Sequence, residues 1–183
     1  VLYKSKILPP LTTVNGKVIH RDWDYLQYFI NEARRLGLKV TVSTAMFPSG
    51  HPATNEGLVY EESRWDGKTC LEYTPDGKML DIREDKKKVG AFLNPVRKDV
   101  RKFALSIVRE IVKNYDVDAY ALDYCRYPGD DSDFSADSRK AFGHYLGKKV
   151  RNFPDDIFTW NADGTKNPGI YYKEWWAFRA NVI

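Results

Sequence analysis

The chain has 183 residues, 43% of them hydrophobic and 30% charged, and its net charge is +4 at pH 7. These values are ordinary for a globular protein, and the length favours one compact domain with a sizeable core over two domains. No run approaches the roughly 18 to 20 apolar residues of a membrane helix, so we expect no membrane span.

The basic residues are spread along the chain rather than gathered in one long run. Short basic clusters occur at Lys86–Lys88, Arg97–Lys102 and Lys148–Arg151. Solvated helix faces and loops explain such clusters better than a nucleic-acid surface, so we expect no nucleic-acid partner. The twelve tyrosines and five tryptophans suit a sugar-stacking surface, although a large aromatic core is the simpler explanation.

The cysteines and histidines follow no metal-binding pattern. Cys70 and Cys125 provide neither a disulfide framework nor metal-ligand spacing, and a bond between the two stays open. His20, His51 and His144 fall in unrelated segments without the H-x-x-x-H spacing of a metallohydrolase. We therefore expect no metal ion and no cofactor.

The first part of the chain predicts a loop, a helix and a strand. Residues 1–20 contain two prolines and a glycine and show no periodicity, which indicates a loop. Asp22 is a plausible N-cap for the helix that follows, and Gly37 stands where a left-handed C-cap is expected. The apolar residues of this helix recur at helical spacing: Trp23, Leu26, Phe29, Ile30, Ala33 and Leu36. Residues 38–47 are rich in β-branched side chains and predict a strand, completing an αβ unit of a parallel sheet.

Residues 48–92 form a long insertion with a hairpin inside it. The segments Thr69–Tyr73 and Lys78–Ile82 flank Pro75–Gly77, which is a typical tight-turn sequence. Long loops between core elements are often functional. The insertion could shape a substrate cleft, and a hairpin without a functional role is an equal alternative.

The clearest helix of the sequence precedes the second predicted core strand. Its apolar stripe consists of Val100, Phe103, Ala104, Ile107, Val108, Ile111, Val112 and Tyr115. Pro95 fits the start of this helix, and Asn94 is either its N-cap or a strand-end side chain in a cleft. Residues 117–123 then predict a largely buried strand, which gives a second αβ unit.

Four chemically useful side chains come together where this strand must end, before Pro128 and Gly129. They are Asp123, Tyr124, Arg126 and Tyr127. α/β barrels have their active sites at the C-terminal ends of their parallel strands. The carboxylate, the guanidinium and the two phenols stand at such a strand end. The alternative is a structural ion pair between Asp123 and Arg126, with the tyrosines serving only to pack.

The last third of the chain predicts two helices. The acidic loop at residues 129–134 could bind calcium, but it lacks the glycine and the terminal glutamate of an EF-hand loop. Ser135 is expected to cap a helix that runs to about Leu146. Residues 153–172 look irregular, and the final helix carries Trp175, Trp176, Arg179 and Val182.

The stretch Leu122–Pro128 resembles the L-D-Y-x-R-Y-P signature of the glycosyl-hydrolase-like family 10, whose members are TIM barrels. Further stretches match the family in the same order: Leu2–Ser5, Glu32–Val40, Leu93–Pro95, Tyr115–Asp118, Phe134–Ser135 and Trp176–Arg179. Ala119 replaces a usual glycine, and Cys125 replaces a usual branched apolar residue. Since a complete barrel takes about 250 residues, the resemblance implies an α/β chain that holds the central βα units of a (β/α)8 barrel. We therefore expect 1–183 to be part of one domain, truncated at both ends.

The resemblance implies a glycoside hydrolase, a class of enzyme that normally uses two carboxyl groups. Asp123 is the expected catalytic carboxyl group, acting as acid if Arg126 contacts the substrate and as base or nucleophile if Arg126 holds it ionised. The expected substrate contacts are Tyr3, Lys4, Ser5, Asn94, Tyr124, Arg126 and Tyr127. The partner would be an oligosaccharide or polysaccharide, and the resemblance implies an exported protein. A non-catalytic glycan-binding protein on the same scaffold is the alternative. A part-barrel would also expose strand edges and an apolar face, which predicts poor solubility or association for an isolated 1–183.

Overall fold

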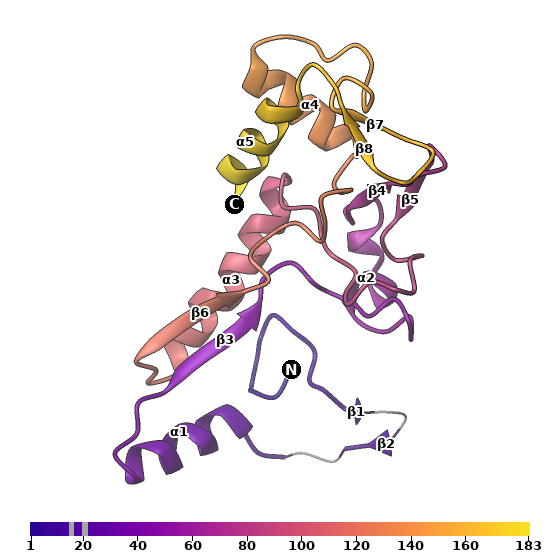
Figure 1. Ribbon diagram of the computed structural model, residues 1–183. Coiled ribbons are helices and arrows are strands. Elements are labelled where there is room, and N and C mark those ends of the chain that lie inside the picture. Colours follow the sequence, from indigo (N-terminus) through magenta and orange to yellow (C-terminus); the bar gives the residue numbers. More distant parts are fainter. Residues whose placement is uncertain (15–16, 20–21) are drawn as a thin grey trace. The chain divides into compact units, whose positions relative to one another are not determined.

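The computed structural model describes residues 1–14, 17–19 and 22–183 (Figure 1). His20 lies outside these described residues. The structure is 32% helix and 18% strand, which confirms the α/β class, while the TIM barrel stays a prediction. The described chain forms two compact units. The first combines residues 1–44 with 102–123, and the second combines residues 45–101 with 124–183.

The first unit begins with a hairpin and a capped helix. β1 (Thr13–Val14) pairs with β2 (Lys17–Val18) in antiparallel fashion, so the loop expected over residues 1–20 contains a short sheet. Helix α1 (Tyr25–Arg35) is capped by Asp24, whose carboxylate accepts a 3.0 Å hydrogen bond from the Gln27 amide. The expectation of Asp22 as cap was wrong, because the helix begins two residues later than its apolar pattern indicates.

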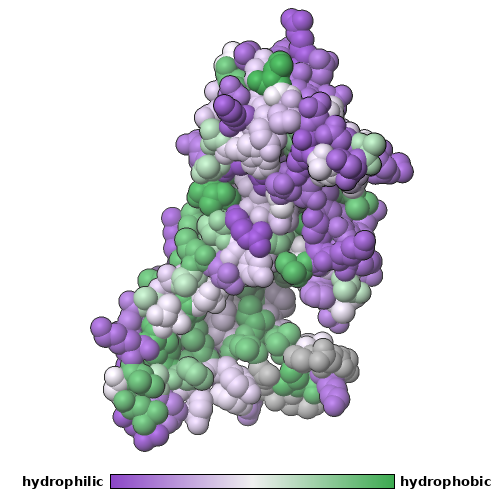
Figure 2. Space-filling model, viewed as in Figure 1, coloured by the Kyte–Doolittle hydropathy of each residue, from purple (hydrophilic) through white to green (hydrophobic). Residues whose placement is uncertain are grey.

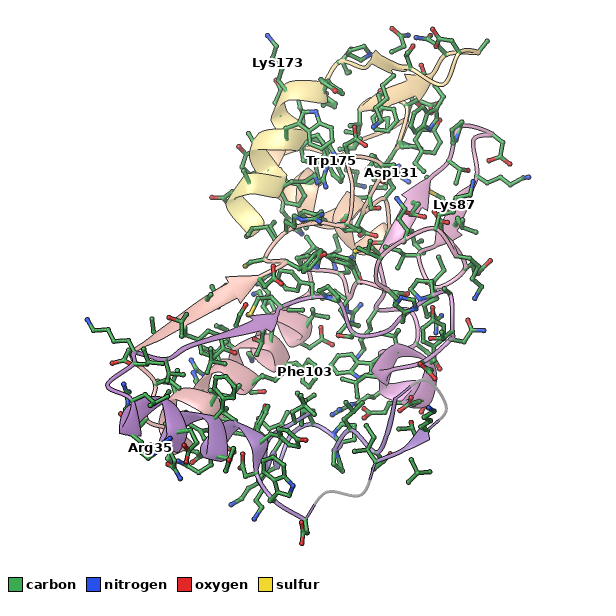
Figure 3. All side chains as sticks on the ribbon, turned by 60° about the horizontal axis from the view of Figure 1, so that its bottom comes forward. Arg35, Lys87, Phe103, Asp131, Lys173 and Trp175 are labelled. Atoms are coloured by element: carbon green, nitrogen blue, oxygen red, sulfur yellow. The ribbon has the colours of Figure 1, made fainter. Side chains whose placement is uncertain are left out.

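The first αβ unit forms as expected. Gly37 ends α1 with φ at +71°, a left-handed conformation that glycine adopts without steric cost, and β3 (Thr41–Ala45) follows. β3 pairs with β6 (Ala119–Asp123), and the two arrows point the same way in Figure 3. Most of α3 (Lys98–Asn114) belongs to this unit. α1, α3 and the residues beside the two strands share a core of Ile30, Ala33, Val40, Ile111 and Tyr115.

β6 is an exposed strand, which corrects the expectation of burial. Four of its five residues are exposed, and Leu122 keeps 51% of its surface accessible. The apolar pattern of residues 117–123 predicts a strand correctly, but burial also needs neighbours, and among the described residues only β3 pairs with β6. Further apolar side chains of this unit are exposed, including Tyr28, Phe29, Leu36 and Leu38. Figure 2 shows hydrophobic atoms gathered over the region of α1.

The second unit holds the insertion and the C-terminal third of the chain. Its elements are α2 (Leu58–Glu61), the 3-10 turn η1 (Ser63–Trp65), β4 (Leu71–Tyr73), β5 (Met79–Asp81), α4 (Ala136–Leu146), β7 (Phe158–Trp160), β8 (Lys166–Pro168) and α5 (Tyr172–Val182). β4 and β5 form the expected hairpin, with Gly77 at φ +77° in its turn. Ser135 caps α4 as expected, by accepting a hydrogen bond from the Ser138 amide. The segment expected to be irregular contains the antiparallel pair β7 and β8.

An aromatic cluster forms the core of the second unit. Trp175 is fully buried and lies 4.9 Å from Phe142 and 5.1 Å from Phe134, measured between ring centroids. Figure 3 labels Trp175, which belongs to α5. The remaining members of the cluster are Tyr73, Val150, Ile157, Phe158 and Phe178. Much of the aromatic content of the sequence therefore builds a core, which was the simpler of its two explanations.

The insertion is bonded to the segment that follows the LDYxRYP signature. The Tyr73 amide donates to the Asp131 carbonyl at 2.8 Å, and the Phe134 amide donates to the Leu71 carbonyl at 2.9 Å. Both cysteines are free, with Cys70 buried directly before β4 and Cys125 partly exposed. β4 therefore fixes the path of residues 131–134.

Candidate functional site

Asp123 is the last residue of β6, and its side chain is exposed. Residues 119–122 lead to this position as a strand, and the backbone turns immediately afterwards at Tyr124, whose φ is +46°. A non-glycine residue in this left-handed region costs roughly 1–2 kcal/mol. Strain of this kind persists only where the surrounding structure over-determines it, and it is frequent at functional sites.

Tyr124 and Arg126 place an aromatic ring and a cation next to each other. The Tyr124 ring lies edge-on to the buried ring of Phe92, with centroids 5.9 Å apart. The Arg126 guanidinium lies 5.0 Å from the centre of the Tyr124 ring. It also donates to the carbonyl of Tyr127 at 2.9 Å and to that of Pro128 at 3.2 Å. These bonds hold the exposed cation against its own turn, a geometry that suits stacking and hydrogen bonding to a polar ligand.

Tyr127 turns inward and packs under a second arginine, Arg179 of α5. The Arg179 guanidinium lies 4.4 Å from the Tyr127 ring and 4.5 Å from the Trp176 ring, and it donates to the Gly129 carbonyl at 2.5 Å. Burial raises the pKa of the Tyr127 hydroxyl and lowers the pKa of Arg179. Neither the Tyr127 hydroxyl nor Arg179 Nε has a hydrogen-bond partner among the described residues. Arg179 therefore positions the turn after the signature by stacking and by one hydrogen bond.

This role of Arg179 was not expected from the sequence. The signal available was the spacing of Trp176 and Arg179, which places both side chains on one face of a helix. Their partner, Tyr127, lies about fifty residues earlier in the chain, and no local pattern connects the two segments.

Asn94 lies inside the second unit, with 1% of its surface accessible. Its side-chain amide donates to Asp133 at 2.5 Å and to the Ser135 hydroxyl at 3.0 Å, while its carbonyl oxygen accepts from the Val96 amide. The reading of Asn94 as the cap of α3 was wrong. α3 begins only at Lys98, because Asn94 closes a tight turn onto Val96 before the helix starts.

Asp133 is the centre of this buried network. Its Oδ1 accepts from the Leu71 amide at 2.6 Å, and its Oδ2 accepts from Asn94 and from the hydroxyls of Ser135 and Ser138. Burial raises the pKa of Asp133, while the two serine hydrogen bonds act in the opposite direction. The carboxylate joins β4, the segment before α3 and the start of α4. It therefore holds together the elements that carry residues 124–135.

The other carboxylates of the acidic loop are paired with lysines. Asp130 lies 2.5 Å from the ammonium of Lys166, and Asp131, labelled in Figure 3, lies 3.1 Å from that of Lys88. Lys88 also pairs with Glu72 at 2.5 Å. Within the described ranges, no group of three or more His, Cys, Asp or Glu side chains is arranged to hold a metal ion.

Glu72 is a buried carboxyl group that sequence reasoning missed. It keeps 2% of its surface accessible, and burial raises its pKa although the Lys88 ammonium acts to lower it. The only sequence signal was a charged residue between two apolar ones, Leu71 and Tyr73, in the predicted hairpin. Its burial follows from the pairing of β4 with the segment around Ser132.

Tyr3 and Ser5 of the first unit both bond to one carboxylate, that of Glu110 on α3. The Tyr3 hydroxyl donates to Glu110 at 3.2 Å, and the Ser5 hydroxyl donates to it at 2.6 Å. Burial and the neighbouring Glu110 raise the pKa of Tyr3 to about 12. The Lys4 amide donates to Asp24 at 3.1 Å, and Lys4 also lines a groove of about 700 Å³ with residues of α1 and α3. The structure thus brings Tyr3 and Ser5 together at Glu110 of α3. Separately, it places Tyr124 and Arg126 next to each other in the turn that follows β6.

The chain matches one family model and a curated relative. Glycosyl hydrolase-like 10 matches residues 1–168. An S-layer-related protein of Niallia circulans is 36% identical over 167 residues, which cover 88% of this chain and 10% of that protein. The chain thus spans about a tenth of that relative's length. Among the described residues, no helix is both long enough and apolar enough to cross a membrane. The chain belongs to the glycosyl hydrolase-like 10 family.

Proposed function

We propose that the chain carries part of the active site of a glycoside hydrolase that cleaves O-glycosidic bonds in a polysaccharide. The observation that carries this proposal is the exposed carboxyl group of Asp123 at the end of β6, directly before the strained Tyr124 and the exposed Arg126. Membership of the glycosyl hydrolase-like 10 family supports a glycan as the ligand.

In this proposal Asp123 is one of the two carboxyl groups that glycoside hydrolysis requires, as proton donor or as base or nucleophile. Tyr124 offers a ring for stacking against a sugar face, and Arg126 offers donors for sugar hydroxyls. Glu72 and Asp133 are not candidates for the second carboxyl group, because they are 2% and 0% exposed and cannot touch a sugar. We place the second carboxyl group at another strand end of the full-length protein.

A (β/α)8 barrel is the proposed architecture of the complete domain. Two observations support it, the repeated helix-to-strand passages α1–β3 and α3–β6, and the side-by-side arrangement of β3 and β6. Further strands beside β6 would cover Leu122 and bring Asp123 into a cleft at the C-terminal end of the sheet. In this proposal Tyr3, Lys4 and Ser5 stay predictions as substrate contacts, whereas Asn94 and Tyr127 do not touch the sugar. Asn94 and Tyr127 would act by positioning the turn, since both are buried.

A location at the cell envelope or outside the cell completes the proposal. The supporting observation is the relative from Niallia circulans, which is named as an S-layer-related protein. The second candidate function is a glycan-binding protein that uses the strand ends without cleaving its ligand, in keeping with a relative that is named for the S-layer and not for an enzyme activity. In that case Tyr124 and Arg126 would carry the binding, and Asp123 would only accept hydrogen bonds from sugar hydroxyls.

The test compares the full-length protein with its Asp123→Asn variant on a panel of bacterial and plant glycans. Released oligosaccharides are measured by mass spectrometry, and binding is measured by calorimetry. Loss of a positioned acid or base lowers the rate by about 10²–10⁴-fold, so Asp123→Asn should lose cleavage by at least 100-fold and keep binding within a fewfold. Asp22→Asn is the matched control, because it makes the same change on an exposed aspartate outside the site. Binding without cleavage by the wild type would instead favour the glycan-binding candidate.

A further inference from the structure

A groove of about 630 Å³ runs along one face of α4 and the loop that follows it. Three of its lining residues have little or no side chain, namely Ala136, Gly143 and Gly147, and they recur at helical spacing. A row of small residues on one helix face leaves a hollow between the longer side chains at its borders. The volume lies within the range of about 300–1,000 Å³ typical of ligand sites.

The backbone around the groove depends on its two glycines. The Lys148 amide donates to the Gly143 carbonyl at 3.0 Å, and a Cβ atom at Gly143 would approach the Lys148 carbonyl to 3.1 Å. Gly147 ends α4 in the left-handed conformation, with φ at +67°. The chain therefore turns back along α4 directly after the helix, and residues 148–150 form the second wall.

The side chains at the borders of the groove are basic. They are Arg139, Lys140, His144, Lys148 and Lys149, and no acidic residue lines the groove. The whole chain has a net charge of +4, and this groove alone gathers four permanent cations. The groove therefore carries a net positive charge, unlike the acidic loop at residues 130–133, where lysines and aspartates neutralise one another.

Only part of this charge has a structural role. The Arg139 guanidinium donates to the carbonyls of Val150 and Arg151, and so fixes the second wall. The Lys148 ammonium lies 4.6 Å from the ring of Tyr171. Lys140 and Lys149 pair with no carboxylate in the part of the chain that the structure describes. The helix dipole favours cations at Lys148 and Lys149, near the C-terminus of α4. It does not explain Lys140, which lies in the first half of the helix.

We propose that this groove binds the negatively charged groups of an acidic polysaccharide, and that it serves as an accessory subsite of the protein. The proposal rests on the glycan-directed function proposed above and names the substrate class, a chain that carries carboxylates or phosphates. Lys140 and Lys149 provide exposed cations, and the row of small residues provides room for the sugar units. The groove has no carboxylate or amide side chain to select neutral hydroxyl groups, so it discriminates by charge.

The test measures binding of three oligosaccharides of matched length to the full-length protein by calorimetry. An oligogalacturonate carries carboxylates, a glycerol-phosphate oligomer carries phosphates, and a cello-oligosaccharide is neutral. The variant is Lys140→Gln/Lys149→Gln. The matched control is Lys87→Gln/Lys173→Gln, which removes two cations of the same unit that lie outside the groove (Figure 3).

We expect at least one charged oligosaccharide to bind about tenfold more weakly to the groove variant, since each exposed charge pair contributes modestly. The control variant should change the dissociation constant by less than twofold, and raising the salt concentration should weaken wild-type binding. Carboxylate and phosphate probes identify which anion the groove prefers. Binding that is equal for charged and neutral probes, or unchanged in the groove variant, would overturn the proposal.

Two further outcomes separate this proposal from its alternatives. A 20-base-pair DNA duplex that binds more tightly than both charged glycans, with the same loss in the groove variant, would assign the surface to nucleic acid and overturn the glycan. Cleavage of a neutral glycan by the wild type tests Asp123 independently, because such a substrate places no charge in the groove. Failure of cleavage with intact charge-dependent binding would thus count against the hydrolase alone.

Discussion

Replacing Asp133 with alanine should open the second unit locally around β4. The substitution removes the acceptor of the Leu71 amide, 2.6 Å away, and of the Asn94 side-chain amide, 2.5 Å away. The hydroxyls of Ser135 and Ser138 can rotate toward other acceptors, but the two amides are fixed by the backbone and by Val96. An unsatisfied buried donor costs about 1–3 kcal/mol. Two of them give about 2–6 kcal/mol, which is reduced because a desolvated carboxylate is also removed.

We therefore expect a loss of about 3 kcal/mol in the free energy of local opening, because these terms partly cancel. Asp133→Asn should lower the free energy of local opening by somewhat less, since asparagine keeps the shape of the side chain and one acceptor oxygen. A loss remains because its NH2 group would face groups that are themselves donors. Both losses are large against the 5–15 kcal/mol by which folded proteins are stable. They should appear first in residues 71–73 and 131–135, which this carboxylate joins.

The assay is hydrogen–deuterium exchange of the full-length protein, read by mass spectrometry on one peptide that covers residues 71–73 and one that covers residues 131–135. A loss of about 3 kcal/mol corresponds to roughly 100-fold faster exchange, since each 1.4 kcal/mol is a factor of ten. Asp22→Asn is the control and should change exchange by less than threefold, because its side chain is exposed. Unchanged exchange of both peptides in Asp133→Ala would refute the reasoning that this network holds the unit together.

Three further predictions concern the same unit. Phe142→Ala should destabilise it by about 3–5 kcal/mol, measured by urea unfolding, because the fully buried ring contacts Trp175 and Phe178; a loss below 1 kcal/mol would contradict this packing. Hydrogen bonds from Lys68 and Arg97 lower the pKa of Asp99 to about 2 against the effect of burial, so its stabilising contribution is present above about pH 4 and is lost as the pH falls toward 2. Asp99→Asn should reduce the loss of stability between pH 4 and pH 2 by about 0.5 kcal/mol, since the Lys68–Asp99 ion pair is partly exposed. Melting temperatures of wild type and variant that depend on pH in the same way from pH 2 to 5 would count against this prediction. Arg179→Met should change the melting temperature by only a few degrees, because an incompletely bonded buried guanidinium adds little net stability. The same substitution should speed amide exchange at residues 127–131, because the hydrogen bond from Arg179 to the Gly129 carbonyl is lost. Exchange protection of these residues equal to that of the wild type would show that Arg179 does not position the turn.

Local signals in the sequence predicted most of the secondary structure. The Gly37 stop after α1, the Pro75–Gly77 turn and the Ser135 cap of α4 each depend on a few neighbouring residues, and all three are present. The signature itself was also readable, because its residues are contiguous from Leu122 to Pro128. Family membership then confirmed the resemblance that these residues indicated.

Burial, in contrast, was decided by contacts between distant segments. The pattern of β6 is that of a buried strand, but the strand is exposed because β3 is its only described neighbour. Asp133 reads as part of a solvated acidic loop, yet Leu71, 62 residues earlier, draws it into the interior. Glu72 and Arg179 likewise show no local signal of burial, which follows from the pairing of Glu72 with Ser132 and the stacking of Arg179 on Tyr127.

The sequence by itself therefore determined most of α1, α3, α4 and α5, the turns and the identity of the chemical groups at the end of β6. The tertiary structure decided which of these groups reach solvent, which hold the signature turn in place, and which form the basic groove on α4. The physical reason is that backbone conformation follows from neighbours in the chain, whereas desolvation and charge pairing depend on whichever segments pack together, at any separation.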